Sequence, residues 1–150
     1  MRRLLDFLSP VPFPGWFMRL SGRLNVAWLR LAGGRGPLSS DVVILTTRGR
    51  RSGQLRSTTL LYFERSGQRY VVASFAGLDR HPAWYLNLLA DPHVIEGIGG
   101  TETRSVARVL GPDEAADVWP FLDEAYPGFR RYRRRTERDI PIVQLVPEPG

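Results

Sequence analysis

Residues 42–63, Val-Val-Ile-Leu-Thr-Thr-Arg-Gly-Arg-Arg-Ser-Gly-Gln-Leu-Arg-Ser-Thr-Thr-Leu-Leu-Tyr-Phe, contain two apolar, β-prone runs joined by a cationic loop. The loop, residues 48–56, has four arginines, two glycines and no acidic residue. Apolar and β-branched runs on either side of a Gly- and Ser-containing segment are typical of paired strands. The stretch therefore predicts two strands joined by a loop that is either an anion-binding site or a solvated connection.

The whole chain has the composition of a folded protein with a basic surface. Its 150 residues, 43% of them hydrophobic, are enough for one domain with a core. All 21 basic residues are arginine, and the formal net charge is +6. Because guanidinium groups bind phosphate and carboxylate through two parallel hydrogen bonds, this composition favours anionic partners.

Several kinds of site are excluded by what the sequence lacks. There is no cysteine, which rules out disulfides, thiolate metal ligands and a cysteine nucleophile. His81 and His93 are too far apart for a local metal motif, so we expect no metal. No Walker loop, dinucleotide fingerprint or HExxH motif occurs. If the protein is an enzyme, its reactive group is expected on a bound cofactor.

Residues 1–36 are predicted to be a basic amphipathic N-terminal segment, followed by a domain at residues 37–150. The segment contains six arginines and one acid, and residues 16–32 have the apolar spacing of a helix. That helix either lies on an anionic membrane surface or packs on the domain or on a second subunit. We expect no transmembrane helix and no secretory signal. The expected location is the cytoplasm, with peripheral contact at the inner face of the membrane if the helix binds lipid.

The rest of the chain reads as short strands with a few helices. Strands are predicted at residues 42–47, 55–65, 68–74, 94–98, 101–110 and 140–146, and helices at 81–90 and 112–125, with a third helical region within 126–138. Ser66-Gly67 marks a tight hairpin turn. This order predicts a mainly β protein with helices (α+β), in which an antiparallel sheet forms a closed or split barrel and the helices pack outside.

Three clusters outside the loop are candidates for ligand contacts. They are Ser74 at a strand end, the helix residues Trp84, Tyr85 and Asn87, and an aromatic stripe of Tyr126, Phe129 and Tyr132. Each has a structural alternative, because a strand-terminal serine is common and aromatic residues at helical spacing often pack in a core.

Three blocks of sequence, in this order, carry a resemblance to a known family. They are Leu-Thr-Thr-Arg-Gly-Arg-Arg-Ser-Gly-Gln at 45–54, Asp-Arg-His-Pro-Ala-Trp-Tyr-Leu-Asn-Leu at 79–88 and Arg-Asp-Ile-Pro-Ile-Val at 138–143. With them the chain resembles the deazaflavin-dependent nitroreductase family of coenzyme F420 oxidoreductases. The resemblance implies a split β-barrel of the flavin-reductase, FMN-binding type. It also implies hydride transfer from reduced F420 to an electrophilic acceptor, a quinone before nitroaromatics or enones.

The resemblance also implies site residues by motif position. The phosphate and glutamate tail of the coenzyme would be held by Arg50, Arg51, Ser52 and Arg56. The ring would be surrounded by Ser57, Thr58, Thr59, Leu60, Leu61, Val72, Ala73, Ser74, Phe75, Ala83, Trp84, Tyr85, Leu86 and Asn87. Ser74 and Tyr126 are the expected catalytic residues, and Tyr126, Phe129 and Tyr132 would border the acceptor pocket.

The chain departs from the family pattern at several positions, and two alternatives remain. Arg51 stands where lysine is usual, Thr59 replaces a common proline, and Phe129 lacks a hydroxyl that some nitroreducing relatives carry. One alternative is an FMN-binding split-barrel oxidoreductase. The other is a non-catalytic basic module for anionic lipid or nucleic acid, which the dispersal of the basic residues over three segments disfavours. We expect a small-molecule acceptor and no nucleic-acid partner, and leave the oligomeric state open.

Overall fold

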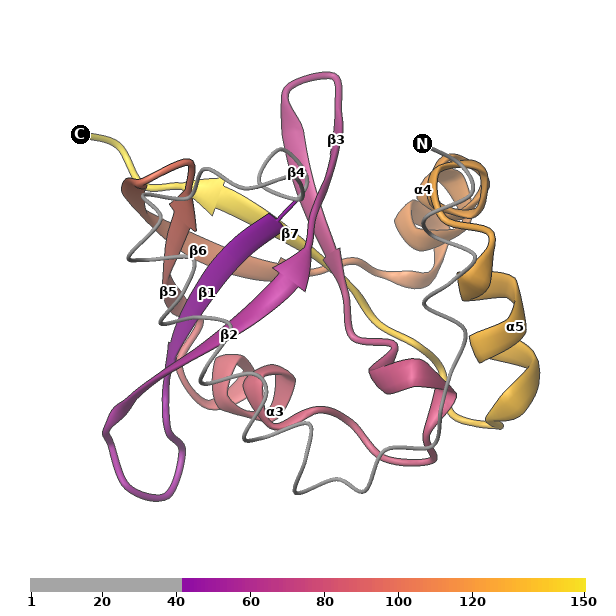
Figure 1. Cartoon of the computed structure of the whole chain (residues 1–150), viewed down its shortest axis with the longest axis horizontal. Coiled ribbons are helices and arrows are strands. Elements are labelled where there is room, and N and C mark those ends of the chain that lie inside the picture. Colours follow the sequence, from indigo (N-terminus) through magenta and orange to yellow (C-terminus); the bar gives the residue numbers. More distant parts are fainter. Residues whose placement is uncertain (1–41) are drawn as a thin grey trace.

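The sheet of this protein is antiparallel and curls on itself (Figure 1). The computed structural model describes residues 42–150, so the predictions for residues 1–36 lie outside the described part. The strands are β1 (Val42–Arg48), β2 (Leu55–Leu61), β3 (Phe63–Arg65), β4 (Gln68–Val72), β5 (His93–Ile98), β6 (Thr101–Val109) and β7 (Ile142–Pro147). The helices are η3 (Phe75–Gly77), α3 (Ala83–Ala90), α4 (Pro112–Ala125) and α5 (Gly128–Arg135).

The two edges of the sheet meet at a single residue. The strand order is β2-β1-β5-β6-β7-β4-β3, so the edge strands β2 and β3 are separated in sequence only by Tyr62. The chain pairs with β1 up to Leu61 and with β4 from Phe63. The one strand predicted over residues 55–65 is therefore wrong as a single ladder, because the segment changes partner at Tyr62. This change joins the sheet edges and gives the split barrel that the sequence predicted.

Alternate side chains of the strands fill the barrel. Successive residues of a strand face opposite sides of the sheet, and the register pairs Val43 with Leu60 and Val71 with Val143. The fully buried residues of this core include Val43, Leu45, Val71, Val143 and Leu145. In β1 the buried Val43, Leu45 and Thr47 alternate with partly exposed residues, within the strand predicted from its β-branched composition.

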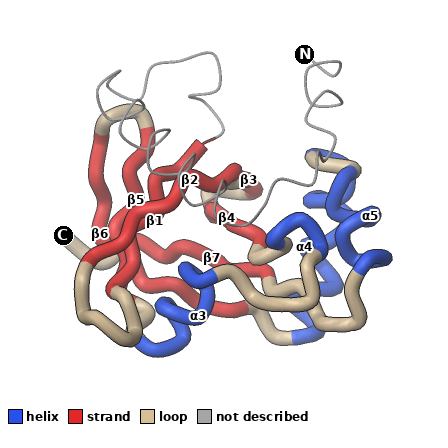
Figure 2. Tube along the Cα trace, turned by 60° about the horizontal axis from the view of Figure 1, so that its bottom comes forward, coloured by secondary structure: helices blue, strands red, loops and turns tan. Residues whose placement is uncertain are grey.

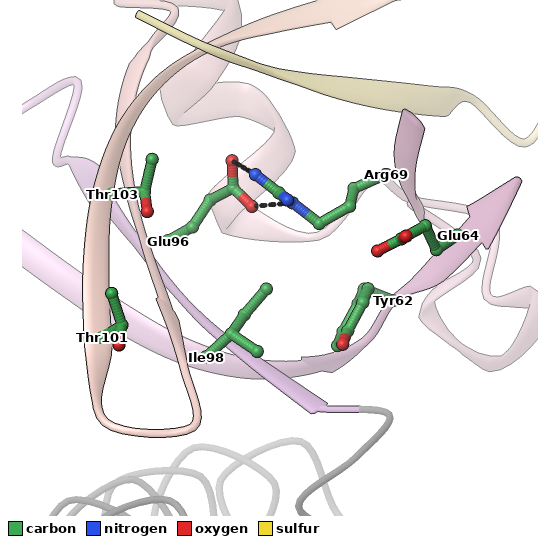
Figure 3. A pocket seen from close by; sticks show the side chains of 7 residues that line it. All are labelled: Tyr62, Glu64, Arg69, Glu96, Ile98, Thr101 and Thr103. Carbon is green, nitrogen blue, oxygen red and sulfur yellow. Dashed lines mark hydrogen bonds and ion pairs between the residues drawn. The ribbon is translucent and has the colours of Figure 1, made fainter. Parts of the chain in front are cut away.

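An ion pair crosses the barrel interior. Arg69 on β4 donates from Nε to Glu96 Oε2 over 2.7 Å and from Nη2 to Glu96 Oε1 over 3.3 Å (Figure 3). The Ser105 hydroxyl on β6 donates to Oε1 as well. Glu96 on β5 is only 1% exposed, and its hydrogen bond raises the pKa of Arg69 against the effect of burial. Since β6 and β7 separate β4 from β5 in the sheet, the pair links opposite walls.

The helices occupy two separate positions around the barrel. α4 and α5 lie together on one side of the sheet, whereas α3 lies apart from them, next to β1 and the loop that follows it (Figures 1 and 2). α4 has the bounds that the sequence predicted, and its Leu122 is buried against Tyr70 and Ile142 on the outer face of the sheet. Ser66 and Gly67 both have positive φ (53° and 75°), which confirms the predicted tight turn between β3 and β4.

The interior ion pair gives the first prediction. Arg69→Met should lower the free energy of unfolding by about 3–5 kcal/mol, because it leaves Glu96 buried without its cation. The matched control is Arg65→Met, whose partner Asp117 is exposed, and which should cost less than about 1 kcal/mol. Chemical denaturation of the two variants measures the difference. Equal losses would contradict a special role for the interior pair.

Candidate functional site

The arginine loop, defined here as residues 48–56, has a fixed backbone. Gly49 N–H donates to the carbonyl of Gln54 over 2.7 Å, and Gly53 N–H donates back to the Gly49 carbonyl over 2.8 Å. Gly53 has φ +70°, the left-handed region that glycine adopts without a steric penalty. A Cβ on Gly49 would lie 2.8 Å from Ser52 Oγ. The two glycines therefore allow a narrow turn that presents the arginines in a defined arrangement.

Asn87 attaches this loop to α3 and β1. Its Oδ1 accepts from the backbone N–H of Arg50 over 3.2 Å and from Arg50 Nη1 over 3.3 Å. Its Nδ2 donates to Thr47 Oγ1 over 3.2 Å. Asn87 is 5% exposed, so both halves of its amide are engaged inside the protein. Asn87, which was predicted to contact the coenzyme ring, therefore positions Arg50 in this structure.

The charges of the loop are unevenly compensated. Arg48 lies 3.6 Å from Asp91 and donates to the Gly53 carbonyl. Arg51 and Arg56 are exposed and form no ion pair within residues 42–150, and Arg50 contacts the neutral Asn87. Three guanidinium groups are therefore available to an anionic ligand, and each can bind phosphate or carboxylate through two hydrogen bonds. The donor set fits the phosphate and carboxylates that the resemblance implies.

The strand after the loop carries a second sign of a ligand site. Thr59 Oγ1 on β2 is buried and has no hydrogen-bond partner in the described part of the chain. An unsatisfied buried hydroxyl costs about 1–3 kcal/mol, so such groups call for an explanation. Nearby on β2, the Ser57 hydroxyl is 2.7 Å from Thr46 Oγ1. Thr59 is thus a candidate for hydrogen bonding to a ligand that covers this strand.

Ser74 begins a turn with an unusual backbone. Phe75, Ala76 and Gly77 have φ values of 44°, 54° and 75° in succession. For the two residues with side chains this left-handed conformation costs about 1–2 kcal/mol each. A Cβ on Gly77 would lie 2.8 Å from the Tyr132 carbonyl, which shows how closely the turn is pressed against α5. The fold therefore brings the Ser74 turn next to α5, the helix that carries Phe129 and Tyr132.

The predicted aromatic stripe divides into a core residue and two hydroxyls. Phe129 is 5% exposed and packs edge-on against Phe63, with ring centres 5.5 Å apart. Tyr126 and Tyr132 are half-buried, and their hydroxyl oxygens are 3.1 Å apart. Burial, helped by the hydrogen bond to Tyr132, raises the pKa of Tyr126 to about 12. Tyr126 therefore keeps its proton at all ordinary pH values.

The remaining predicted ring contacts differ in accessibility. Val72, Ala73, Trp84 and Tyr85 are buried in the two hydrophobic clusters, Thr58, Leu60, Phe75 and Leu86 are half-buried, and Leu61 and Ala83 are exposed. Ser52, predicted to hold the phosphate and tail, is exposed as well. Trp84 and Tyr85 thus pack in the core of the described residues, which is the structural alternative considered for them. Arg138, whose side chain contacts the Ser74 turn, begins the family block at 138–143 but was not predicted as a site residue.

A cavity of about 210 Å³ lies at the other end of the barrel. Its lining residues are Tyr62, Glu64, Arg69, Glu96, Ile98, Thr101 and Thr103 (Figure 3). It lies where β1 begins, whereas the arginine loop follows the end of β1, seven residues and about 20 Å along the strand. None of the predicted site residues lines it. The cavity and the candidate site are therefore separate places in the fold.

Comparison with known proteins identifies related chains. The family model described as F420H(2)-dependent quinone reductase matches residues 21–147. The chain is 35% identical over 118 residues to F420H(2)-dependent quinone reductase Rv1261c of Mycobacterium tuberculosis, covering 76% of this chain and 78% of that protein. A solved structure named F420-H2 dependent reductase (FDR-A) has 35% identity and a TM-score of 0.63, over 70% of this chain and 93% of that one. Another, described as a domain-swapped dimer, has 32% identity and a TM-score of 0.67, over 82% and 95%.

The position of Asn87 predicts how the loop responds to mutation. Asn87→Ala should lower the free energy of unfolding by about 1–3 kcal/mol, because Thr47 Oγ1 and the Arg50 N–H lose their partners. Amide hydrogen exchange in residues 49–54 should become faster. Asn87→Asp keeps an acceptor for Arg50 and should retain slow exchange. Unchanged exchange in Asn87→Ala would show that α3 does not hold the loop.

Proposed function

Since the chain belongs to the F420H(2)-dependent quinone reductase family, a family of oxidoreductases, we propose that it transfers a hydride from reduced coenzyme F420 to a quinone. Reduced F420, when bound, supplies a hydride from C5 of its deazaflavin ring, and the quinone takes up this hydride together with a proton. The protein's contribution is to hold both partners, to orient them and to supply hydrogen bonds.

The observation that carries the proposal is the set of unpaired arginines in a fixed loop. Arg50, Arg51 and Arg56 have no carboxylate partner among the described residues, and Asn87 fixes the backbone of Arg50. Like charges held near one another in a fixed loop repel each other, and a bound anion would relieve that repulsion. In our proposal these three residues and Ser52 hold the phosphate and glutamate tail of F420.

The ring of the coenzyme is proposed to lie against β2 and the Ser74 turn. The buried, unpartnered Thr59 hydroxyl offers it a hydrogen bond that no described residue takes. Phe75 and Ala76 hold a strained backbone next to Ser74, and such strain is common where a ligand must be positioned. Ser74 would then contact the reacting partners and orient the acceptor.

Proton supply is proposed for Tyr126, which lies between α4 and α5, and for Tyr132 on α5. The Tyr126 hydroxyl keeps its proton because its pKa is raised to about 12, and Tyr132 Oη lies 3.1 Å away. A phenol that stays protonated can donate a hydrogen bond to a quinone oxygen as negative charge develops there. The second hydroxyl can in turn replace the donated proton. Phe129 supports this pair from the core.

Contact with a membrane is part of the proposal for a quinone acceptor. Quinones of the electron-transport type are apolar, and residues 1–36 are basic and amphipathic in sequence. We propose that this segment binds the inner face of the membrane from the cytoplasm. Among the helices of residues 42–150, none has the length and apolar composition needed to cross a bilayer.

Charge reversal in the loop tests the coenzyme assignment. Arg51→Glu should weaken binding of oxidised F420, followed by fluorescence titration, by about 10- to 100-fold, since a charge-assisted hydrogen bond contributes about 1.5–3 kcal/mol. Thermal unfolding should change little because Arg51 is exposed.

The control for this titration is Arg134→Glu, the same charge change on the exposed face of α5. It should leave F420 affinity near that of the unmodified protein. Equal F420 affinity in Arg51→Glu would remove the loop from the site. Tight binding of FMN but not F420 by the unmodified protein would favour the FMN-binding alternative.

The raised pKa of Tyr126 predicts the alkaline side of the pH profile. Reduction of a soluble menaquinone analogue should lose no activity to Tyr126 ionisation between pH 7 and 10, because its pKa is about 12. Tyr126→Phe should lower kcat by about 10- to 100-fold at every pH. Tyr70→Phe is the control, since within residues 42–150 the Tyr70 hydroxyl donates to Gln68, outside the proposed site. A kcat unchanged in Tyr126→Phe would rule out proton supply by this residue.

A further inference from the structure

The turn after β4 leaves several carbonyl groups without a strand partner. β4 pairs with β7 as far as Val72, and the last contact of this kind is Ala73 N–H to the Pro141 carbonyl over 3.0 Å. Beyond it the chain reverses through the left-handed residues 75–77. Gly77 N–H donates to the Ser74 carbonyl over 2.9 Å, which closes the turn but leaves the carbonyls of Ala73 and Leu78 to other donors.

Arg138 binds both ends of this turn with one guanidinium group. Its Nε donates to the Leu78 carbonyl over 2.8 Å, and its Nη2 donates to the Ser74 carbonyl over 2.8 Å. Its Nη1 donates to the Ala73 carbonyl over 3.2 Å and lies 3.3 Å from His81 Nδ1. A planar group with five N–H donors can reach these separated acceptors at once, which the single ammonium nitrogen of lysine cannot.

No carboxylate forms an ion pair with Arg138 in the described part of the chain. Its charge is instead satisfied by main-chain dipoles, and burial lowers the pKa of Arg138. An arginine used in this way is not available to a substrate anion. Its five donors fix the backbone of Ala73, Ser74 and Leu78 instead.

We propose that Arg138 is a positioning residue for the acceptor reaction. It holds the turn at Ser74 and Phe75 in a fixed position relative to α5. This inference rests on the proposed function of Ser74. At Gly77 the turn lies against the Tyr132 backbone and the Arg135 side chain of α5, so a shift of the turn would move Ser74 relative to the helix that carries Tyr132. Arg138 itself touches neither reacting partner in this proposal.

His81 makes this arrangement sensitive to acid. Its Nδ1 can accept from Arg138 only while the ring is neutral, and the groups around it are Arg138, the Tyr85 ring at 4.8 Å and, near Arg138, Asp79. Burial and then the charge of Arg138 lower the pKa of His81 below its ordinary 6.5. The unfolded chain therefore binds the proton more readily. The stability due to neutral His81 is present above pH 6.5 and is lost as the pH falls through the lowered pKa.

Hydrogen–deuterium exchange tests the positioning role without using turnover. In Arg138→Lys and Arg138→Met, the amides of Gly77 and Leu78, whose acceptors lie within the turn, should exchange at least about tenfold faster than in the unmodified protein. Arg134→Met, an exposed arginine on α5, should leave them unchanged. Equal exchange in the Arg138 variants would overturn the proposal, whether or not the protein reduces quinones.

Turnover measurements then show whether the position of the turn affects the rate of quinone reduction. Below the unfolding temperature, Arg138→Lys should lower kcat for a menaquinone analogue at least about tenfold while F420 affinity changes less. In Arg138→Met, the acid limb of the kcat-against-pH profile should move toward the ordinary histidine pKa, because the charge that, after burial, lowers the pKa of His81 is gone. In a double-mutant cycle, Ser74→Ala should cost less in the Arg138→Lys background than alone. Additive losses would overturn action through Ser74. An inactive unmodified protein would refute the quinone proposal alone.

Discussion

The ion pair between Arg69 and Glu96 fixes the two walls of the curled sheet to each other. The two residues belong to strands that are not neighbours, so their bidentate contact forms only when the sheet has curled completely. A buried pair adds little net stability, because desolvation offsets the attraction. Its value is specificity. A slip of β5 by one residue would turn Glu96 outward and Ile95 inward, leaving Arg69 without its partner. The pair therefore selects one register among those that the apolar residues alone would permit.

The split barrel gives the site its two supports. The arginine loop is joined to α3 through Asn87, and the Ser74 turn is joined to α5 and to Arg138. Loops attached to a rigid scaffold commonly carry binding and catalysis. The chain uses arginine alone as its basic residue, yet in three physical roles: Arg69 neutralises a buried acid, Arg138 donates to carbonyls, and Arg51 remains free for a ligand. Net charge by itself would have assigned all three to anion binding.

The sequence predicted those features that depend on neighbouring residues. The β-branched strand before Arg48, the Ser66-Gly67 turn and the bounds of α4 all follow from local pattern. The change of partner at Tyr62 could not be predicted, since no turn residue in the β-prone segment from Leu55 to Arg65 marks where one partner ends. Glu96 was equally hidden, because an acid in a strand ordinarily faces water and its partner is 27 residues away.

The candidate site shows the same division. The free arginines of the loop were accessible to sequence reasoning because charge without nearby acids is visible in the sequence. The contacts of Asn87 and Arg138 could not be predicted, because their partners are main-chain groups far along the chain. Asn87 binds the N–H of Arg50, 37 residues away, and Arg138 binds the carbonyl of Ser74, 64 residues away. The result is two separately supported halves, one built on α3 and one on α5. If Phe129 and Tyr132 border the acceptor as proposed, substitutions at these two positions should change the acceptor half of the site and leave the arginine loop on α3 undisturbed.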